Sequence, residues 1–297
     1  MTPSLLFQPI TLGTQAIKNR LVCTVEETRI DTCMAGKPVG ERWESIASLA
    51  NYGVWFLDAG SVHDSSRIGL ALHNDAVQPS RRWVAQQAQR LDVKVIQRLT
   101  HGGLRFPPQN GASPWGPSSR LGPSGRYSRF MTIDDIREIS LAFVSAALMC
   151  QLSGLNGIEI SVTDMHLMQQ FISEEYNERD DRYGGSCKNR CRFLLETVRA
   201  VRAAVGSDFA VGLAAGVTEG ILFDPDGLES NLLMQLISEH LLDFISVSGP
   251  TKAFPAGTFG LPRVMNRTWA SFEDAKGLIS DAKADFVAVT LAPEHVC

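Results

Sequence analysis

Three polar side chains that can do acid–base chemistry follow a short apolar run near the middle of the chain. Residues Gly157 to Ile160 have the pattern of a strand buried in a sheet, and Ser161, Asp164 and His166 come directly after it. A histidine exchanges protons near neutral pH, and a serine hydroxyl forms hydrogen bonds with a carbonyl group. The spacing predicts a catalytic loop in which His166 transfers a proton and Asp164 or Ser161 positions it.

Arg98, His101, Glu26 and Glu27 are further candidates because each lies near the end of an expected strand. An unpaired cation in an interior strand is costly, so Arg98 is expected to pair with Glu26 or Glu27. Arg98 or His101 can also polarise a carbonyl group. The alternatives are structural: His101 is equally typical of a packed strand end, and the two glutamates are equally typical of solvated loop charges.

Eight short apolar runs alternate with amphipathic segments, which is typical of parallel strands joined by crossover helices. The expected strands are Arg20 to Cys23, Val54 to Leu57, Val93 to Leu99, Gly157 to Ile160, Phe209 to Leu213, Phe244 to Val247, Arg263 to Met265 and Phe286 to Val289. The expected helices are Glu41 to Asn51, Ser80 to Leu91, Thr132 to Leu152, Lys188 to Val205, Asp226 to Leu242 and Ser271 to Ala282. The pattern predicts an α/β fold, a TIM (β/α)8 barrel.

Two segments depart from the regular alternation. Gly102 to Arg129 is rich in Gly, Pro and Ser, so we expect a long excursion over the barrel mouth. Ser248 to Pro262 contains so many Gly and Pro residues that the crossover helix between the sixth and seventh strands is expected to be missing or reduced to a turn.

Length and composition favour one domain over residues 1–297, since 297 residues with 44% hydrophobic content suit one barrel. The net charge is −4 and the basic residues are scattered, which argues against a nucleic-acid partner and favours a small-molecule substrate. The chain shows no leader pattern and no long apolar run, so we predict a cytoplasmic protein without a membrane segment. The sequence does not determine the oligomeric state, and a homo-oligomer is one of the possibilities.

Six dispersed cysteines predict reduced thiols rather than a disulfide framework. Cys187 and Cys191 are four residues apart on one expected helix and can share a face. Neither a histidine nor a further cysteine lies near them in the sequence to complete a zinc site, so no metal is expected.

Several motifs along the chain carry a resemblance to a known family. They are Leu6 to Ile10, Ile17 to Val22, His101-Gly102-Gly103, Met131-Thr132, Gly157 to Ile160, Tyr183-Gly184-Gly185-Ser186 and Ala284 to Ala288. Together they resemble the old yellow enzyme family, the FMN-dependent ene-reductases. The resemblance implies a TIM barrel whose fourth strand ends in catalytic residues, and a Tyr-Gly-Gly-Ser turn that braces the barrel.

The same resemblance shows where this chain departs from the flavin-binding pattern. Thr24 to Glu27 replaces the family's Ala-Pro-Met-Thr, its flavin-binding glutamine falls on Arg98, and the arginine that stabilises the reduced flavin falls on Ala214. At the phosphate end, Arg267-Thr268 replaces Gly-Gly and Thr290-Leu291 replaces Gly-Arg. We also expect a truncated C-terminus, since Cys297 comes earlier than in typical relatives.

The catalytic positions differ in parallel. The family's substrate-binding histidine and its His or Asn partner correspond to Ser161 and Asp164, and the proton-donating tyrosine corresponds to His166. An ionised Asp164 would repel a developing enolate, so it fits better as an orienting group or a base.

These departures lead to three hypotheses. The favoured one is a repurposed, flavin-independent barrel with no cofactor, which catalyses an isomerisation, dehydration or cyclisation of an apolar conjugated molecule in secondary metabolism. The first alternative is an FMN-dependent NAD(P)H ene-reductase, in which Arg98, Arg267 and Thr268 contact the flavin. The second alternative is a non-catalytic binding barrel.

Overall fold

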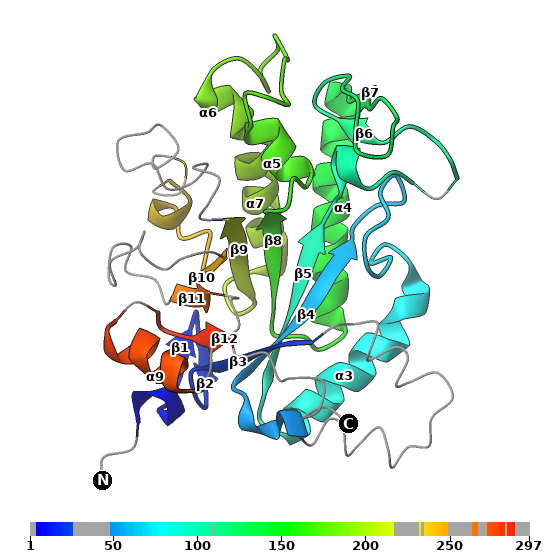
Figure 1. Cartoon of the computed structure of the whole chain (residues 1–297). Coiled ribbons are helices and arrows are strands. Elements are labelled where there is room, and N and C mark those ends of the chain that lie inside the picture. The colour runs from blue at the N-terminus through cyan, green and yellow to red at the C-terminus, as the bar shows by residue number, and fades with distance from the viewer. Residues whose placement is uncertain are drawn as a thin grey trace.

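A parallel sheet forms the centre of the computed structural model, which describes residues 4–25, 48–108, 110–216, 232, 235–248, 263–266, 272–282 and 284–288 (Figure 1). In the described part its eight strands are β3 (Leu21–Val25), β4 (Val54–Ser61), β5 (Lys94–Thr100), β8 (Gly157–Val162), β9 (Ala210–Gly216), β10 (Phe244–Ser248), β11 (Arg263–Asn266) and β12 (Val287–Ala288). The order is β11-β10-β9-β8-β5-β4-β3-β12, with every neighbouring pair parallel. Because β11 also contacts β12, the sheet closes, and the predicted TIM barrel is confirmed.

The strands form where the sequence has short, nearly continuous apolar runs, because parallel strands are buried on both faces. All six residues of β8 are buried. Gly157 begins this strand where a Cβ atom would lie 2.6 Å from the carbonyl oxygen of Ala210, so only glycine fits. On β9, a Cβ at Gly212 would lie 2.1 Å from the ring of Phe244.

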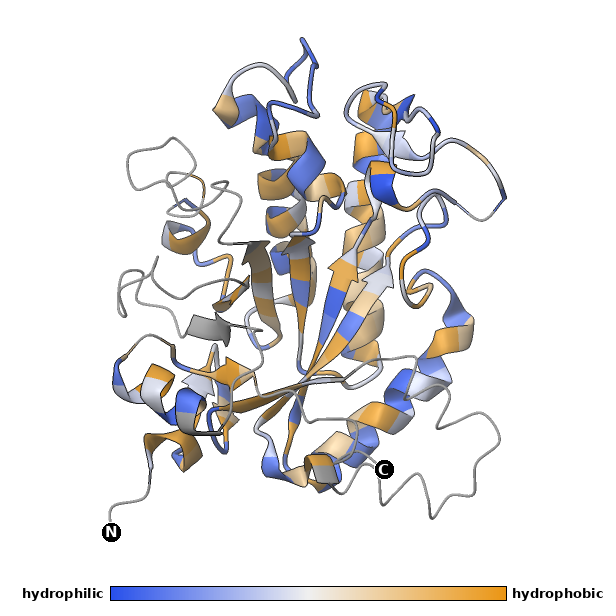
Figure 2. Ribbon diagram, in the orientation of Figure 1, coloured by the Kyte–Doolittle hydropathy of each residue, from blue (hydrophilic) through white to orange (hydrophobic). Residues whose placement is uncertain are grey.

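Helices cover the outer face of the barrel and present an apolar side to it (Figure 2). They include α3 (Gln78–Arg90), α4 (Ile133–Leu152), α7 (Arg192–Val205) and α9 (Phe272–Ser280). The single turn α6 (Cys187–Arg190) comes directly before α7 and stands beyond the carboxyl ends of the strands (Figure 1). Helix α4 begins with a capping box between Thr132 and Asp135. The helix predicted over 188–205 is divided at Cys191. In the helix predicted over 226–242, residues 232 and 235–238 are described and helical.

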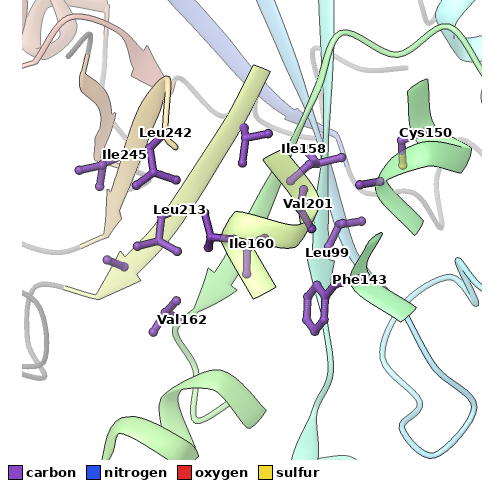
Figure 3. Packing of buried hydrophobic residues seen from close by; sticks show 14 of the residues in the cluster. Leu99, Phe143, Cys150, Ile158, Ile160, Val162, Val201, Leu213, Leu242 and Ile245 are labelled. Atoms are coloured by element: carbon purple, nitrogen blue, oxygen red, sulfur yellow. The ribbon is translucent and has the colours of Figure 1, made fainter. Parts of the chain in front are cut away.

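The apolar core has an outer layer and an inner layer. Phe143 of α4 and Val201 of α7 pack against Leu99, Ile160 and Leu213 of the sheet (Figure 3). Inside the barrel, Phe56 and Phe244 meet edge to face, with their ring centroids 5.8 Å apart. The hairpin of β1 (Ile10–Leu12) and β2 (Gln15–Ile17) adds apolar side chains to this inner cluster, which therefore fills the barrel at the amino ends of its strands.

The predicted excursion between β5 and α4 is present. It contains the short helix η4 (Gly103–Arg105) and the pair β6 (Trp115–Gly116) and β7 (Arg129–Phe130), which stand beyond the carboxyl end of β5 (Figure 1). Buried Arg179 holds it by donating to the carbonyl oxygens of Pro117 and Met131 at 3.1 and 2.7 Å. Of the 248–262 segment, predicted to lack a full helix, only Ser248 at the end of β10 is described, and residues 289–297 lie outside the described part.

The predicted helix over 41–51 is described only as the short helix η2 (Ser48–Asn51). A further short helix, α5 (Leu167–Ile172), follows β8 and was not predicted. Among the described helices none combines the length and the apolar character needed to cross a membrane.

Candidate functional site

The carboxyl ends of β5 and β8 bring together most of the predicted site residues. These neighbouring strands pair Arg98 directly opposite Glu159, and His101 and His166 follow them in sequence. Polar groups at the carboxyl ends of barrel strands form the active sites of TIM-barrel enzymes. The location therefore supports a functional site at this end.

Ser161, Asp164 and His166 are joined through Thr163 in one chain of hydrogen bonds. The Thr163 hydroxyl donates to Asp164 Oδ2 at 2.9 Å, and the Ser161 hydroxyl lies 3.2 Å from Thr163 Oγ1 and 3.1 Å from His166 Nδ1. The Thr163 hydroxyl has one hydrogen and donates it to Asp164, so in the contact between Ser161 and Thr163 the Ser161 hydroxyl must be the donor. Ser161 then accepts from His166, which places the proton of neutral His166 on Nδ1.

This protonation pattern leaves Nε2 of His166 as a hydrogen-bond acceptor. No described residue donates to it, and the ring of Phe106 lies 5.9 Å from the imidazole. Burial lowers the pKa of His166 to about 4, and the cations of Arg98 and Arg105 lower it further while Asp164 opposes them. His166 is therefore neutral near pH 7, with Nδ1–H inside the chain of hydrogen bonds and Nε2 unprotonated.

Arg98 and Glu159 form an ion pair inside the barrel. Arg98 Nε donates to Glu159 Oε2 at 2.7 Å, and the two side chains are 8% and 0% exposed. The partners predicted for Arg98, Glu26 and Glu27, lie outside the described residues. Within the described part of the chain the two terminal nitrogens of Arg98 donate to no protein group, so they are available to a ligand.

His101 uses both ring nitrogens within the protein. Its Nδ1 accepts from the backbone of Gly103 at 3.1 Å, so its Nε2 donates to the Ser65 hydroxyl at 2.8 Å. The Ser65 hydroxyl then donates to Nδ1 of His63 at 2.7 Å, and Nε2 of His63 donates to Glu138 at 3.2 Å. Burial lowers the pKa of His101 to about 3, so it stays neutral. These bonds compete with its predicted role in polarising a carbonyl group, which stays a prediction.

The loop between β8 and α5 is held in an unusual backbone conformation. Asp164 and Met165 have φ angles of 58° and 57°, in the left-handed region that non-glycine residues seldom occupy. The side chains of Gln169 and Gln170 bind the backbone N–H and carbonyl of Met165, both at 2.6 Å, and Arg105 donates to the carbonyl oxygen of Asp164 at 2.7 Å. The loop is thus fixed from both sides before any ligand binds.

Sequence reasoning missed several residues of this site. Glu159 is the one carboxylate in the apolar run 157–160, and that isolated charge in a buried strand was a usable signal. Thr163 and Ser65 carried no comparable signal, because an isolated hydroxyl residue near a strand end is common. Glu26, Glu27, Arg267 and Thr268 lie outside the described residues. Among the described residues no three metal-binding side chains come together.

A closed parallel barrel with a polar site at the carboxyl ends of its strands places this chain in the TIM-barrel class. A sequence model of the NADH:flavin oxidoreductase / NADH oxidase family matches residues 5–251. The chain therefore belongs to the NADH:flavin oxidoreductase / NADH oxidase family, and the resemblance to the old yellow enzymes is confirmed.

Two curated relatives illustrate the range of this family. The N,N-dimethylglycine/sarcosine dehydrogenase of Chromohalobacter salexigens is 31% identical over 262 residues, and the multifunctional alkene reductase/demethylase OYE of Caballeronia cordobensis is 29% identical over 254 residues. Each match covers 82% of this chain, but only 37% and 36% of the relatives. The chain thus spans less than half the length of these two proteins.

Solved structures agree on the fold. Morphinone reductase in complex with tetrahydroNAD superposes with a TM-score of 0.76 at 21% identity, covering 96% of this chain and 86% of that one. 2-Naphthoyl-CoA reductase in complex with 2-naphthoyl-CoA gives the same TM-score and identity, covering 96% and 50%.

The family assignment overturns three linked predictions. The flavin-independent reaction, the isomerase, lyase or cyclase activity and the absence of a cofactor were wrong, because the family and its relatives point to FMN and to oxidoreductase chemistry. The error came from treating each replaced flavin contact as a loss. Ala214 on β9 offers no cation, but buried Arg98 lies on β5, two strands away with β8 between them.

The described residues fit FMN at one edge. The pyrimidine edge of an oxidised flavin carries carbonyl oxygens and one unprotonated ring nitrogen that accept hydrogen bonds, and Arg98 offers two terminal nitrogens that no described protein group uses. Glu159 holds this guanidinium through Nε and leaves those nitrogens free to donate. The residues matched to the phosphate end, Arg267 and Thr268, lie outside the described part.

Proposed function

We propose that this chain is the FMN-binding barrel of an NAD(P)H-dependent oxidoreductase that reduces a carbon–carbon double bond conjugated to a carbonyl group. The observation that carries the proposal is the family match over residues 5–251. The buried Arg98, whose free nitrogens suit the flavin edge, supports it from the site. When bound, FMN supplies hydride transfer between the nicotinamide and the substrate.

In this proposal, Arg98 binds and orients the cofactor. Its guanidinium is fixed by Glu159, so little side-chain freedom is lost when a ligand accepts hydrogen bonds from it. A hydrogen bond from a charged donor contributes about 1.5–3 kcal/mol, so Arg98→Met should weaken FMN binding by about 10- to 150-fold.

His166 is the candidate donor of the proton that alkene reduction adds to one carbon of the substrate. Alkene reduction needs a proton at one carbon, and Nε2 of His166 can donate one only after the imidazole has been protonated. Because its pKa is lowered to about 4, roughly one His166 in a thousand carries that proton at pH 7. If His166 is the donor, kcat/KM for alkene reduction rises as the pH falls from about 7 to about 5.

The unprotonated Nε2 favours a second candidate function. An acceptor at this position suits a substrate that presents an N–H or O–H group, as a small amine does when it is oxidised. A relative that is 31% identical carries the name N,N-dimethylglycine/sarcosine dehydrogenase. Oxidation of a small secondary amine, which carries an N–H group, is therefore the alternative reaction at the same site.

The test has two stages. The purified chain is first titrated with FMN and binding is followed by flavin fluorescence, since an NADH:flavin oxidoreductase barrel should bind it and Arg98→Met should bind it more weakly. The loaded protein is then assayed without oxygen, with NADPH plus 2-cyclohexen-1-one and separately with sarcosine. NADPH oxidation that depends on the enone supports reductase activity, and flavin bleaching by sarcosine supports the alternative. An absence of FMN binding would refute both.

A further inference from the structure

Two thiols lie side by side where α6 meets α7, and neither belongs to the chain of hydrogen bonds around His166. Cys187 begins α6 and Cys191 separates α6 from α7, so the two are one helical turn apart. Their sulfur atoms are 3.8 Å from each other. Cys187 is partly exposed and Cys191 is buried.

Both thiols line one cavity. Its volume is about 350 Å³ and its lining comes from the α6–α7 segment and from residues 232 and 235. The lining residues are Cys187, Lys188, Cys191, Arg192, Leu195, Glu196, Arg199, Leu232 and Gln235. A cavity of about 150 Å³ already holds a benzene ring, so a phenyl-sized group fits beside the sulfurs.

The distance between the two sulfur atoms limits the bond angle at any atom X that both thiols bind together. An atom held at about 2.3 Å from each sulfur, the length of a zinc–thiolate bond, would have an S–X–S angle of about 110° at a separation of 3.8 Å. A linear two-coordinate ion would need about 4.6 Å at the same bond length. The pair therefore suits a bent, thiophilic centre.

The surroundings argue against zinc. A structural zinc site needs four ligands, and no group of three metal-binding side chains occurs among the described residues. Glu196 lines the same cavity, but its Oε2 accepts from the Tyr183 hydroxyl at 2.8 Å. Two thiols alone suffice for a trivalent arsenical, which needs no further protein ligand.

We propose that Cys187 and Cys191 form a dithiol site that captures trivalent organoarsenicals. An organoarsenous oxide, R–As=O, reacts with the two S–H groups to give R–As(S–Cys)2 and water. Two As–S bonds form, both S–H bonds break, the oxygen leaves as water and arsenic stays trivalent. No oxidant or reductant is needed, and the site is independent of the proposed reaction.

The site is coupled to the helix that follows the catalytic loop. Arg190, in the same turn as the two thiols, donates to the carbonyl oxygen of Ile172 at the end of α5 and pairs with Glu174 at 2.8 Å. Closing a ring between Cys187 and Cys191 restrains this turn. Capture should therefore raise the melting temperature, Tm, of the chain.

The experiment uses phenylarsine oxide and intact-protein mass spectrometry of the full chain. We expect one phenylarsenic group per wild-type chain with loss of two thiol hydrogens, and release of that group by 1,2-ethanedithiol. Cys187→Ser should lower the occupancy at least tenfold at equal reagent concentration. Lys188→Ser, an exposed neighbour that leaves both thiols intact, should keep full occupancy.

Two results would overturn the proposal. One is a wild-type chain that takes up no arsenical at reagent equimolar with protein, and the other is a Cys187→Ser chain that takes up as much as wild type. Cys191→Ser is a second test, with folding checked by circular dichroism because Cys191 is buried. A failure of FMN binding in the earlier test leaves this outcome unaffected, so the two proposals are tested separately.

Discussion

The Arg98–Glu159 pair gives the sharpest test of how this barrel is built. Glu159→Gln keeps the shape of the side chain but removes the carboxylate from a pair in which the partners are 8% and 0% exposed. Breaking a buried pair by removing one partner costs about 3–5 kcal/mol, because the remaining charge stays desolvated. At about 2–4 °C per kcal/mol for chains of nearly this size, Tm should fall by about 6–20 °C.

A double-mutant cycle measures the coupling. Tm and the free energy of unfolding in urea are measured for Glu159→Gln, for Arg98→Met and for the double variant. The double variant should cost at least 1 kcal/mol less than the sum of the single changes, because it leaves no unpaired charge. Asp134→Asn in the exposed pair with Arg137 is the control and should change Tm by less than about 2 °C. Strictly additive single effects would refute the coupling.

Three further predictions follow from other buried groups. Burial lowers the pKa of His101 to about 3. Below about pH 6.5 the unfolded chain therefore binds a proton at this histidine that the folded chain does not, so the free energy of unfolding decreases as the pH decreases. Tm of His101→Gln should therefore fall less than wild type between about pH 6.5 and pH 5, and parallel curves would contradict this. Arg179→Lys keeps the charge but loses the guanidinium that bonds Asp181 through Nε and Nη2 while Nη1 reaches the carbonyl oxygens of Pro117 and Met131. Limited proteolysis between β5 and α4 should therefore become at least several-fold faster, and unchanged cleavage would count against a bracing role. Gly212→Ala places a Cβ against Phe244 and should cost about 1–3 kcal/mol in urea unfolding, whereas a neutral effect would show that the ring can move.

The barrel could be predicted from the sequence because two independent patterns indicate its strands. Each strand is a short apolar run, and most of the runs are separated by amphipathic segments of helical length. All eight predicted strands are present, with bounds that differ by a few residues. Helix α5 was missed because its six residues are all buried and show no amphipathic period.

The site was only partly predictable. Ser161, Asp164 and His166 are close in sequence, so their association in one loop followed from the strand before them. The link through Thr163 depends on the left-handed turn at Asp164, which side-chain patterns do not reveal. The pairing of Arg98 with Glu159 depends on strand register, and register is fixed by the whole sheet.

The cofactor prediction failed for a related reason. Position-by-position comparison assumes that each contact must be supplied from the same residue, whereas Arg98 and Ala214 lie on β5 and β9, on either side of β8. The identity of the residue at one aligned position therefore does not decide whether the barrel binds the cofactor.

The left-handed turn at Asp164 and Met165 limits which sequences this loop can accept. Asparagine and glycine tolerate such backbone angles at position 164, whereas valine, isoleucine and threonine do not, whatever their polarity. Mutagenesis libraries that aim to change substrate preference should therefore leave Met165 unchanged, restrict position 164 to Asp, Asn or Gly, and vary Phe106, whose ring lies beside His166.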